Sequence, residues 1–180
     1  MKATGIVRRI DDLGRVVIPK EIRRTMRIRE GDPLEIYTSR DGEVIFKKYS
    51  LLGGLEDFAA QLCETMSRST GSICAVTDRD TVIAVAGGGK RELMGKRITA
   101  ELEQVMENRH LYHYTGDGTP IPVSDNSAAL MTQVAAPILS EGDLLGLVLF
   151  ISTAPGTPAG DTEMKLAQTI AAFLGRHMEG

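Results

Sequence analysis

Apolar and polar positions alternate at the start of the chain in a pattern that predicts a β-hairpin. β-Branched and other apolar residues recur over residues 6–10 and again over 15–18, and residues 11–14 between them have the chemistry of a turn. Pro19 suits the first position of a helix, because the N–H that it lacks would have no partner there. Apolar residues then recur four apart, which predicts a short helix over residues 19–27.

A second hairpin is predicted from residues 34–37 and 44–46, around a turn at residues 40–42. The resulting β-β-α-β-β unit has only about 50 residues, close to the size at which one chain buries too little apolar surface to fold alone. The segment offers neither cysteines nor a set of metal ligands. We therefore expect two copies to dimerise and to complete a shared core.

The rest of the chain has the pattern of a larger α+β domain. Residues 51–55 read as a linker, so that the predicted domains are residues 1–50 and 56–180. The predicted helices cover residues 55–70, 91–108 and 160–178. The predicted strands are residues 72–77, 81–86, 111–114, 120–123, 131–139 and 144–152.

Charge is divided unevenly between these two parts. Residues 1–50 carry 12 Lys or Arg against 8 Asp or Glu, a net charge of +4, whereas residues 51–180 carry 9 against 16, a net charge of −7. A basic segment joined to an acidic body is expected where one part of a protein approaches a polyanion. Solvated surface charge is the simpler alternative, and the charge balance alone does not decide between them.

The composition is that of a folded protein, with 42% hydrophobic and 25% charged residues. No apolar run approaches the roughly 20 residues of a membrane span, and the N-terminus lacks the apolar core of a signal peptide. We expect a cytoplasmic protein that does not enter the membrane. Cys63 and Cys74 lack the spacing of a zinc site and are predicted to be small core residues.

Motifs for enzymatic chemistry are incomplete. The sequence from Gly87 to Lys90 lacks the earlier glycine and the following Ser or Thr of a phosphate-binding loop, although anion binding at the next helix stays open. His110, His113 and His177 have no partners at metal-ligand spacing. No nucleophile motif is present. We expect no enzyme activity, no cofactor and no metal.

The first fifty residues resemble the AbrB family of transition-state regulators. The resemblance rests on residues 1–9, 13–19, Arg23-Arg24 and 47–49. It implies a swapped-hairpin dimer that binds double-stranded DNA. The whole chain resembles the sporulation regulators of this family that carry a longer C-terminal domain, and that second part resembles a GAF domain, a fold used for small-molecule sensing or for dimerisation.

The resemblance places Arg8, Arg15, Arg23 and Arg24 at the family's DNA-contacting positions, with Arg9 at a neighbouring basic position. The pattern agrees, because a hairpin brings residues 8 and 15 together and two consecutive helical residues lie about 100° apart. Two copies would present about eight such guanidinium groups, which suit phosphates and guanine edges. The alternative is that these arginines only pair with Asp11, Asp12 and Glu21.

The predicted function is a DNA-binding transcription regulator of sporulation genes, an activator or a repressor, which associates with the nucleoid. It would bind mainly through phosphates and groove shape. The broad apolar face of the helix over 160–178 is expected mostly to pack on its own sheet. Together with the helix over 55–66 it could instead form a second interface that makes a homotetramer, and an effector of unknown identity could bind the GAF-like domain. Two alternatives remain: an antitoxin that binds a toxin, and a GAF-type methionine sulfoxide reductase using Cys63 and Cys74.

Overall fold

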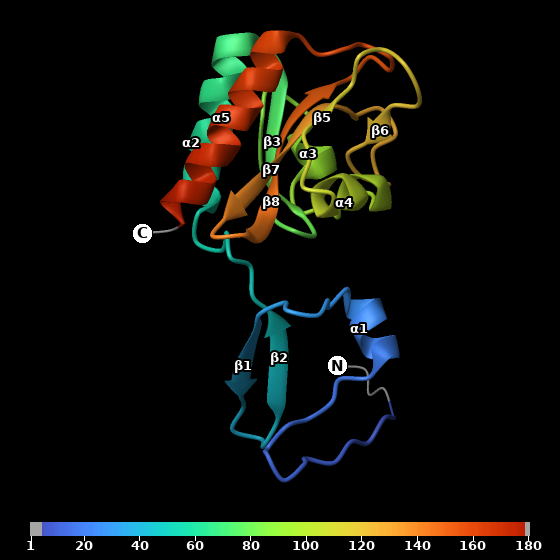
Figure 1. The fold of residues 1–180 in the computed structure, drawn as a ribbon, viewed down its shortest axis with the longest axis vertical. Helices are drawn as coiled ribbons and strands as arrows, with labels where there is room; N and C mark the ends of the chain where they lie inside the picture. Colours follow the sequence, from blue (N-terminus) through green and yellow to red (C-terminus); the bar gives the residue numbers. More distant parts are fainter. Residues whose placement is uncertain (1–4, 179–180) are drawn as a thin grey trace. The chain divides into compact units, whose positions relative to one another are not determined.

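The computed structural model describes residues 5–178, which divide into two compact units on either side of the bond between Tyr49 and Ser50 (Figure 1). Residues 1–4 and 179–180, at the outer ends of the predicted domains, lie outside the described residues. Among the described helices, none is both long and apolar enough to cross a bilayer. The functional limits of the predicted domains and of the linker at residues 51–55 stay a prediction.

The first unit contains one helix and one antiparallel strand pair. Helix α1 (Lys20–Met26) lies within the range predicted, but Pro19 precedes it as the N-cap residue and is not its first helical residue. It ends at Arg27, which is in the left-handed conformation with φ 51°. Strands β1 (Leu34–Thr38) and β2 (Val44–Lys48) pair in register, Leu34 opposite Lys48 and Thr38 opposite Val44. The second predicted hairpin is therefore present.

The predicted strands over residues 6–10 and 15–18 are not formed in a single chain. Among the described residues, backbone hydrogen bonds hold only the turn, where the Asp11 N–H donates to the Arg15 carbonyl over 3.1 Å. The apolar side chains of this segment are uncovered; Val7 is 90% exposed. Pro19 is the one buried residue among the described residues of the unit. A β-strand needs both a paired neighbour and a covered face, and one copy supplies neither.

The second unit is built on a six-stranded antiparallel sheet with strand order β4-β3-β8-β7-β5, and β6 also pairs with β7 (Figure 1). The two long central strands are adjacent in the chain, as the sequence predicts. The strands are β3 (Ile73–Thr77), β4 (Val82–Ala86), β5 (Tyr112–His113), β6 (Ile121–Pro122), β7 (Met131–Ser140) and β8 (Asp143–Ser152).

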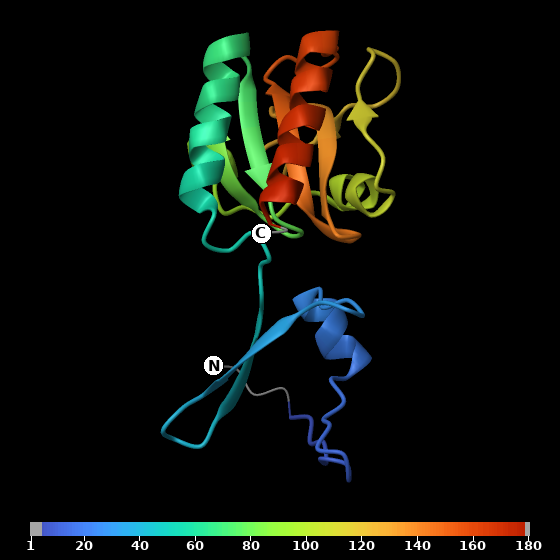
Figure 2. The same ribbon diagram turned by 60° about the vertical axis from the view of Figure 1, so that its left-hand side comes forward.

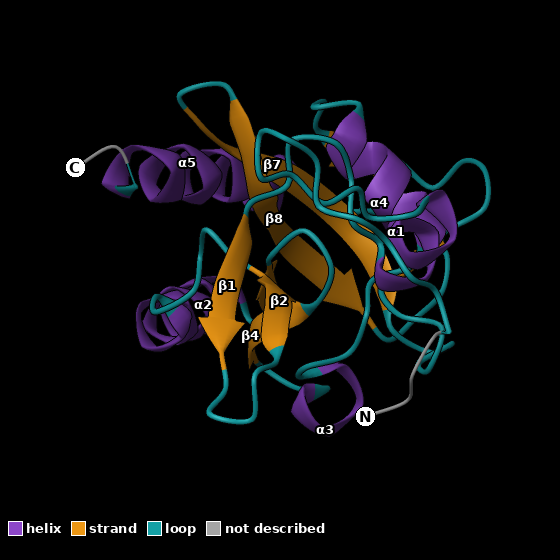
Figure 3. Ribbon diagram, turned by 90° about the horizontal axis from the view of Figure 1, so that it is seen from below, coloured by secondary structure: helices purple, strands orange, loops and turns teal. Residues whose placement is uncertain are grey.

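Helices cover both faces of this sheet. Helices α2 (Glu56–Thr70) and α5 (Asp161–His177) pack on one face, side by side (Figure 2). Helices α3 (Lys90–Leu93) and α4 (Ala100–Glu107) pack on the other, and Figure 3 shows the sheet between α5 and α4. Each face has its own apolar core. The predicted α+β layout of this part of the chain, with helices on an antiparallel sheet, is confirmed.

The helix predicted over residues 91–108 is wrong as a single element, because two short helices replace it. Gly95 lies in the left-handed region with φ 71°, and its N–H donates to the Val82 carbonyl of β4 over 2.9 Å. The chain then restarts at Thr99, whose hydroxyl caps α4 by accepting from the Leu102 N–H over 3.3 Å. A glycine followed by an N-capping threonine is a stop and start signal in the sequence itself.

Small residues allow the helices and strands to approach closely. A Cβ on Gly175 of α5 would overlap the Leu139 carbonyl of β7, and a Cβ on Gly146 of β8 would overlap the Thr77 carbonyl of β3. Leu52, only 1% exposed, anchors the chain just before α2 in the core between the sheet and the helices. Gly175 therefore sets how tightly α5 sits on the sheet, and Gly146 allows β8 and β3 to lie close together.

Candidate nucleic-acid interface

The turn of the N-terminal segment is organised by Asp11. Its Oδ1 accepts from the backbone N–H groups of Leu13 and Arg15 over 3.0 and 2.8 Å, and its Oδ2 accepts from the Arg15 Nε over 2.8 Å. The backbone and side-chain hydrogen bonds from Arg15 lower the pKa of the Asp11 carboxyl below its ordinary value. Asp11 therefore stays a carboxylate and fixes the two arms of the turn, which carry Arg8 and Arg9 on one side and Arg15 on the other.

Three of the predicted arginines present their side chains to solvent around this turn. Arg8 and Arg9 are exposed, and no ion pair involves either of them among residues 5–178. Arg15 keeps 69% of its side-chain surface exposed although it pairs with Asp11. The alternative of surface pairing thus holds for Arg15, but an exposed pair of this kind contributes little stability and is readily exchanged for a phosphate.

Helix α1 carries the other two predicted arginines. Pro19 is the N-cap residue of the helix, and its carbonyl accepts from the Arg23 N–H over 2.9 Å. Arg24 is exposed, whereas Arg23 is half-buried. The Nε of Arg23 is buried and has no hydrogen-bond partner. The two consecutive residues therefore face different surroundings, as the helical angle between them requires.

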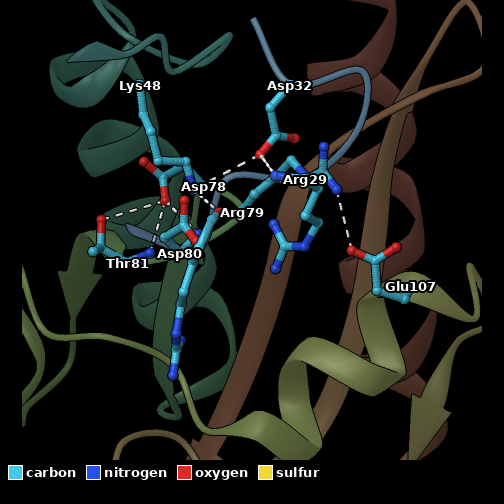
Figure 4. A network of polar contacts seen from close by, with 9 residues as sticks. Arg29, Asp32, Lys48, Asp78, Arg79, Asp80, Thr81 and Glu107 are labelled. Atoms are coloured by element: carbon cyan, nitrogen blue, oxygen red, sulfur yellow. Dashed lines mark hydrogen bonds and ion pairs between the residues drawn. The ribbon is translucent and has the colours of Figure 1, made fainter. Parts of the chain in front are cut away.

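A polar cluster holds the end of α1 against the second hairpin (Figure 4). Lys48 on β2 donates from Nζ to the Arg27 carbonyl over 2.8 Å, and the same Nζ lies 4.0 Å from Oδ2 of Asp32. Asp32 Oδ2 also accepts from the Arg29 N–H over 2.8 Å. These contacts fix the orientation of α1, which carries the two arginines, relative to the strand pair.

Polar contacts in the second unit are structural in character (Figure 4). Asp78 Oδ1 accepts from the N–H groups of Asp80 and Thr81 over 2.8 and 2.7 Å, which closes the turn between β3 and β4. Arg79 pairs with Glu107 of α4 over 3.1 Å. The contacts brace the α4 side of the sheet.

All five predicted DNA-binding residues lie in the first unit, in two groups: Arg8, Arg9 and Arg15 around the turn, and Arg23 and Arg24 on α1. Their role in DNA binding stays a prediction. Sequence reasoning missed two supporting features. One is the contact of Lys48 with the end of α1; the other is the Lys47 Nζ, which lies 4.7 Å from the centroid of the Tyr37 ring. The contact between Lys47 and Tyr37 could have been predicted from strand alternation, because diagonal residues on paired strands share a face.

The two cysteines are held as inert thiols. Both Cys63 on α2 and Cys74 on β3 are free and buried. Burial, above all, raises the pKa of each thiol to about 12. A reactive cysteine needs a lowered thiol pKa and solvent access, and these residues have the opposite properties. Both cysteines are core residues, as predicted.

Two family profiles match the chain. The profile described as "Stage V sporulation protein T C-terminal, transcription factor" matches residues 54–179. The profile described as "Antidote-toxin recognition MazE, bacterial antitoxin" matches residues 7–50. The division between the two matches follows the division between the two units.

Similar proteins span both the whole chain and its parts. Stage V sporulation protein T of Bacillus subtilis is 46% identical over 179 residues, which is 99% of both chains. Transition state regulatory protein AbrB of the same organism is 63% identical over 49 residues, covering 27% of this chain and 50% of that protein. A type II free methionine-R-sulfoxide reductase from Thermoplasma acidophilum is 12% identical with a TM-score of 0.51, covering 69% of this chain and 94% of that one. This last likeness shows the fold of the second unit alone.

Proposed function

We propose that this chain, which belongs to the stage V sporulation protein T family of transcription factors, regulates sporulation genes by binding double-stranded DNA through a dimeric first unit. One observation carries this proposal: the basic N-terminal unit, 63% identical to a transition state regulator, is joined to a C-terminal domain of a transcription-factor family. Family membership supports a role as a regulator.

The DNA contact would be made by Arg8, Arg9, Arg15, Arg23 and Arg24. The turn arginines and Arg24 are exposed. α1 has only seven residues, too short to read many base pairs as a recognition helix does. Guanidinium groups on a turn and on a short helix suit phosphates and groove shape better than an extended base readout.

Dimerisation would complete the first unit. Its apolar side chains are exposed to a degree that is rare in stable monomers. Those of residues 6–18 belong to segments with strand composition and no strand partner. A second copy could supply both the missing strands and the missing core. In such a dimer the arginine groups would occur twice, related by two-fold symmetry as in a duplex.

A second interface on α2 and α5 would join two such dimers into a tetramer. Phe58 of α2 lies 6.0 Å from Phe173 and 5.0 Å from His177 of α5, centroid to centroid. Phe173 nevertheless remains 48% exposed. An exposed aromatic cluster between two helices is a common core for a helical interface. Phe173→Asp would then reduce a tetramer to dimers in sedimentation, whereas a wild-type dimer would exclude this interface.

The second unit would also receive a small-molecule effector, which would change the spacing of the two DNA-binding ends. The protein would act in the cytoplasm, on the nucleoid. Neither alternative function is favoured. The antitoxin profile covers only residues 7–50, and the rest of the chain folds as a domain where an antitoxin needs a wrapping tail. Buried thiols with a raised pKa do not suit a cysteine-dependent reductase.

Arginine substitutions in the intact protein test the DNA contact. Arg8→Ala and Arg24→Ala are each expected to weaken binding to genomic DNA fragments about tenfold, as the loss of charged contacts at two symmetric sites would require. Arg91→Ala removes an equally exposed charge from α3 and serves as the matched control. Unchanged affinity in both arginine variants, with a secondary structure like that of the wild type, would exclude this contact surface.

A further inference from the structure

A groove of about 410 Å³ runs along the second unit between α5 and β7. Its volume lies within the range of small-molecule sites. Gln168 and Arg176 line it from the helix, and Arg109 lines it from the segment that follows α4. The walls and floor between them are apolar and include Leu111, Pro137 and Leu139.

Its length follows from the spacing of the residues of α5 that line it. Gln168, Ala172 and Arg176 recur every four residues, so they form one stripe about 12 Å long on the helix surface. Gly175 lets the helix touch the Leu139 carbonyl, so that α5 lies low beside the strand. The groove is therefore elongated, with an amide at the Gln168 end and a guanidinium at the Arg176 end.

Two guanidinium groups line this groove although the unit around it is acidic, with 9 basic and 16 acidic residues over 51–180. No acidic side chain lines it, and no ion pair involves Arg109 or Arg176 among residues 5–178. A cation near a helix C-terminus is common, which would account for Arg176 on α5. It does not account for Arg109.

Arg109 is held in place by its own backbone and by the next turn. Its φ is 56°, an uncommon conformation for a residue other than glycine, and its Nη1 donates to the Gly142 carbonyl over 2.8 Å. That contact uses one of the five N–H donors of a guanidinium. The Arg109 side chain, which lines the groove, is thereby anchored at one of its donors. Unusual backbone conformations of this kind gather at binding sites.

We propose that this groove binds a small amphipathic anion, in which a carboxylate or phosphate sits between Arg109 and Arg176 and a short apolar chain lies along Leu139 and Ala172. Two guanidiniums with unpaired donors match such an oxyanion in charge and in hydrogen-bonding capacity. The apolar walls match the chain. The inference rests on the proposed function only in supplying a site for its effector. The groove is lined by residues of the second unit, whereas the candidate DNA-binding arginines belong to the first.

Titration of the intact protein with sodium octanoate, octyl phosphate and 1-octanol, followed by calorimetry, tests the site directly. At least one of the two anions is expected to bind with one site per chain, and neutral 1-octanol about tenfold more weakly, because it cannot use the guanidiniums. A preference between the two anions would identify the head group. Arg109→Gln and Arg176→Gln should each weaken anion binding about tenfold, and Arg91→Gln should not change it.

The proposal would be overturned by three results. The first is that neither anion binds at about 10 mM, a concentration beyond the Kd of a weak ligand. The second is binding that both glutamine variants leave unchanged. The third is loss of self-association in those variants without anion binding in the wild type, which would make the groove an interface between copies. DNA binding measured in the same variants should equal that of the wild type, so that failure at this site is distinguished from failure of the proposed function.

Discussion

Arg15 donates from Nε to Oδ2 of Asp11 over 2.8 Å, across the turn of the N-terminal segment. The same carboxylate accepts the backbone N–H groups of Leu13 and Arg15, so one acidic side chain both shapes the turn and neutralises an arginine on it. An arginine that is to contact a phosphate must leave this carboxylate. Asp11 therefore limits the affinity of the candidate interface while it preserves the interface's shape.

Replacing Asp11 with asparagine separates these two roles. Asp11→Asn keeps an oxygen that can accept the backbone N–H groups, but it removes the charge that competes with phosphate for Arg15. DNA affinity is expected to rise a few fold, the size of an exposed ion pair. Fluorescence anisotropy with a labelled duplex measures it. Asp12→Asn removes the same charge without the contact to Arg15; an equal gain in both variants would assign the effect to net charge alone.

A charge in the uncovered apolar segment should prevent dimerisation. Val17 is 68% exposed in the single chain and is predicted to enter the shared core of the dimer. Val17→Asp would bury an unpaired carboxylate there, and the first unit should then lose both self-association and DNA binding. Sedimentation and DNA titration of the intact chain measure the two effects. Met94→Asp, at an exposed apolar residue of the second unit, is the control; a Val17→Asp protein that assembles like this control would refute the shared core.

Gly175 should be indispensable to the packing of α5 on the sheet. A Cβ at this residue would overlap the Leu139 carbonyl, which belongs to the backbone and cannot rotate away. Gly175→Ala is expected to destabilise the second unit by about 1–3 kcal/mol, even though alanine favours helix. Urea unfolding measures it. Thr169→Ala, at an exposed residue of the same helix, should change stability far less, and equal effects in the two variants would contradict the close approach.

The two thiols should resist modification until the second unit unfolds. Burial raises the pKa of Cys63 and Cys74 from 9.0 to about 12, so at pH 8 the folded protein should react with a disulfide reagent far more slowly than the urea-unfolded chain. As pH rises from 9 toward 12, unfolded thiols lose protons that folded thiols retain, so stability should fall over that range. Rapid labelling of the native protein would contradict the burial of both residues.

Sequence patterns predicted most of the second unit because its strands and helices bury their apolar faces within one chain. The long strands β7 and β8 and the helices α2 and α5 follow their predicted ranges to within a few residues. The single helix expected over 91–108 failed because apolar periodicity continues through Gly95 and Thr99, whose backbone conformations interrupt it. The capping signal at Thr99 was available, but the contact of Gly95 with β4 depends on the tertiary fold.

In the first unit, sequence patterns predicted the features that depend on local chemistry but not those that depend on a second copy. The turn at Asp11 and the start of α1 after Pro19 depend on local chemistry, and both appear in the structure. Strand pairing of residues 6–10 and 15–18 requires atoms that one chain does not contain, so no pattern within the chain could place it. The groove at Arg109 and Arg176 also escaped prediction, because it joins residues 67 positions apart whose proximity only the packing of α5 on β7 creates.

The salt dependence of DNA binding by the intact protein tests the central claim most directly. If a dimer places its exposed arginines on phosphates, the logarithm of the binding constant should fall steeply and linearly with the logarithm of salt concentration, with a slope of about −5 or steeper. Arg24→Ala should make that slope shallower by about 2, one phosphate for each copy in the dimer. A slope near zero, or no binding at about 50 mM salt where phosphate contacts are strongest, would contradict the account.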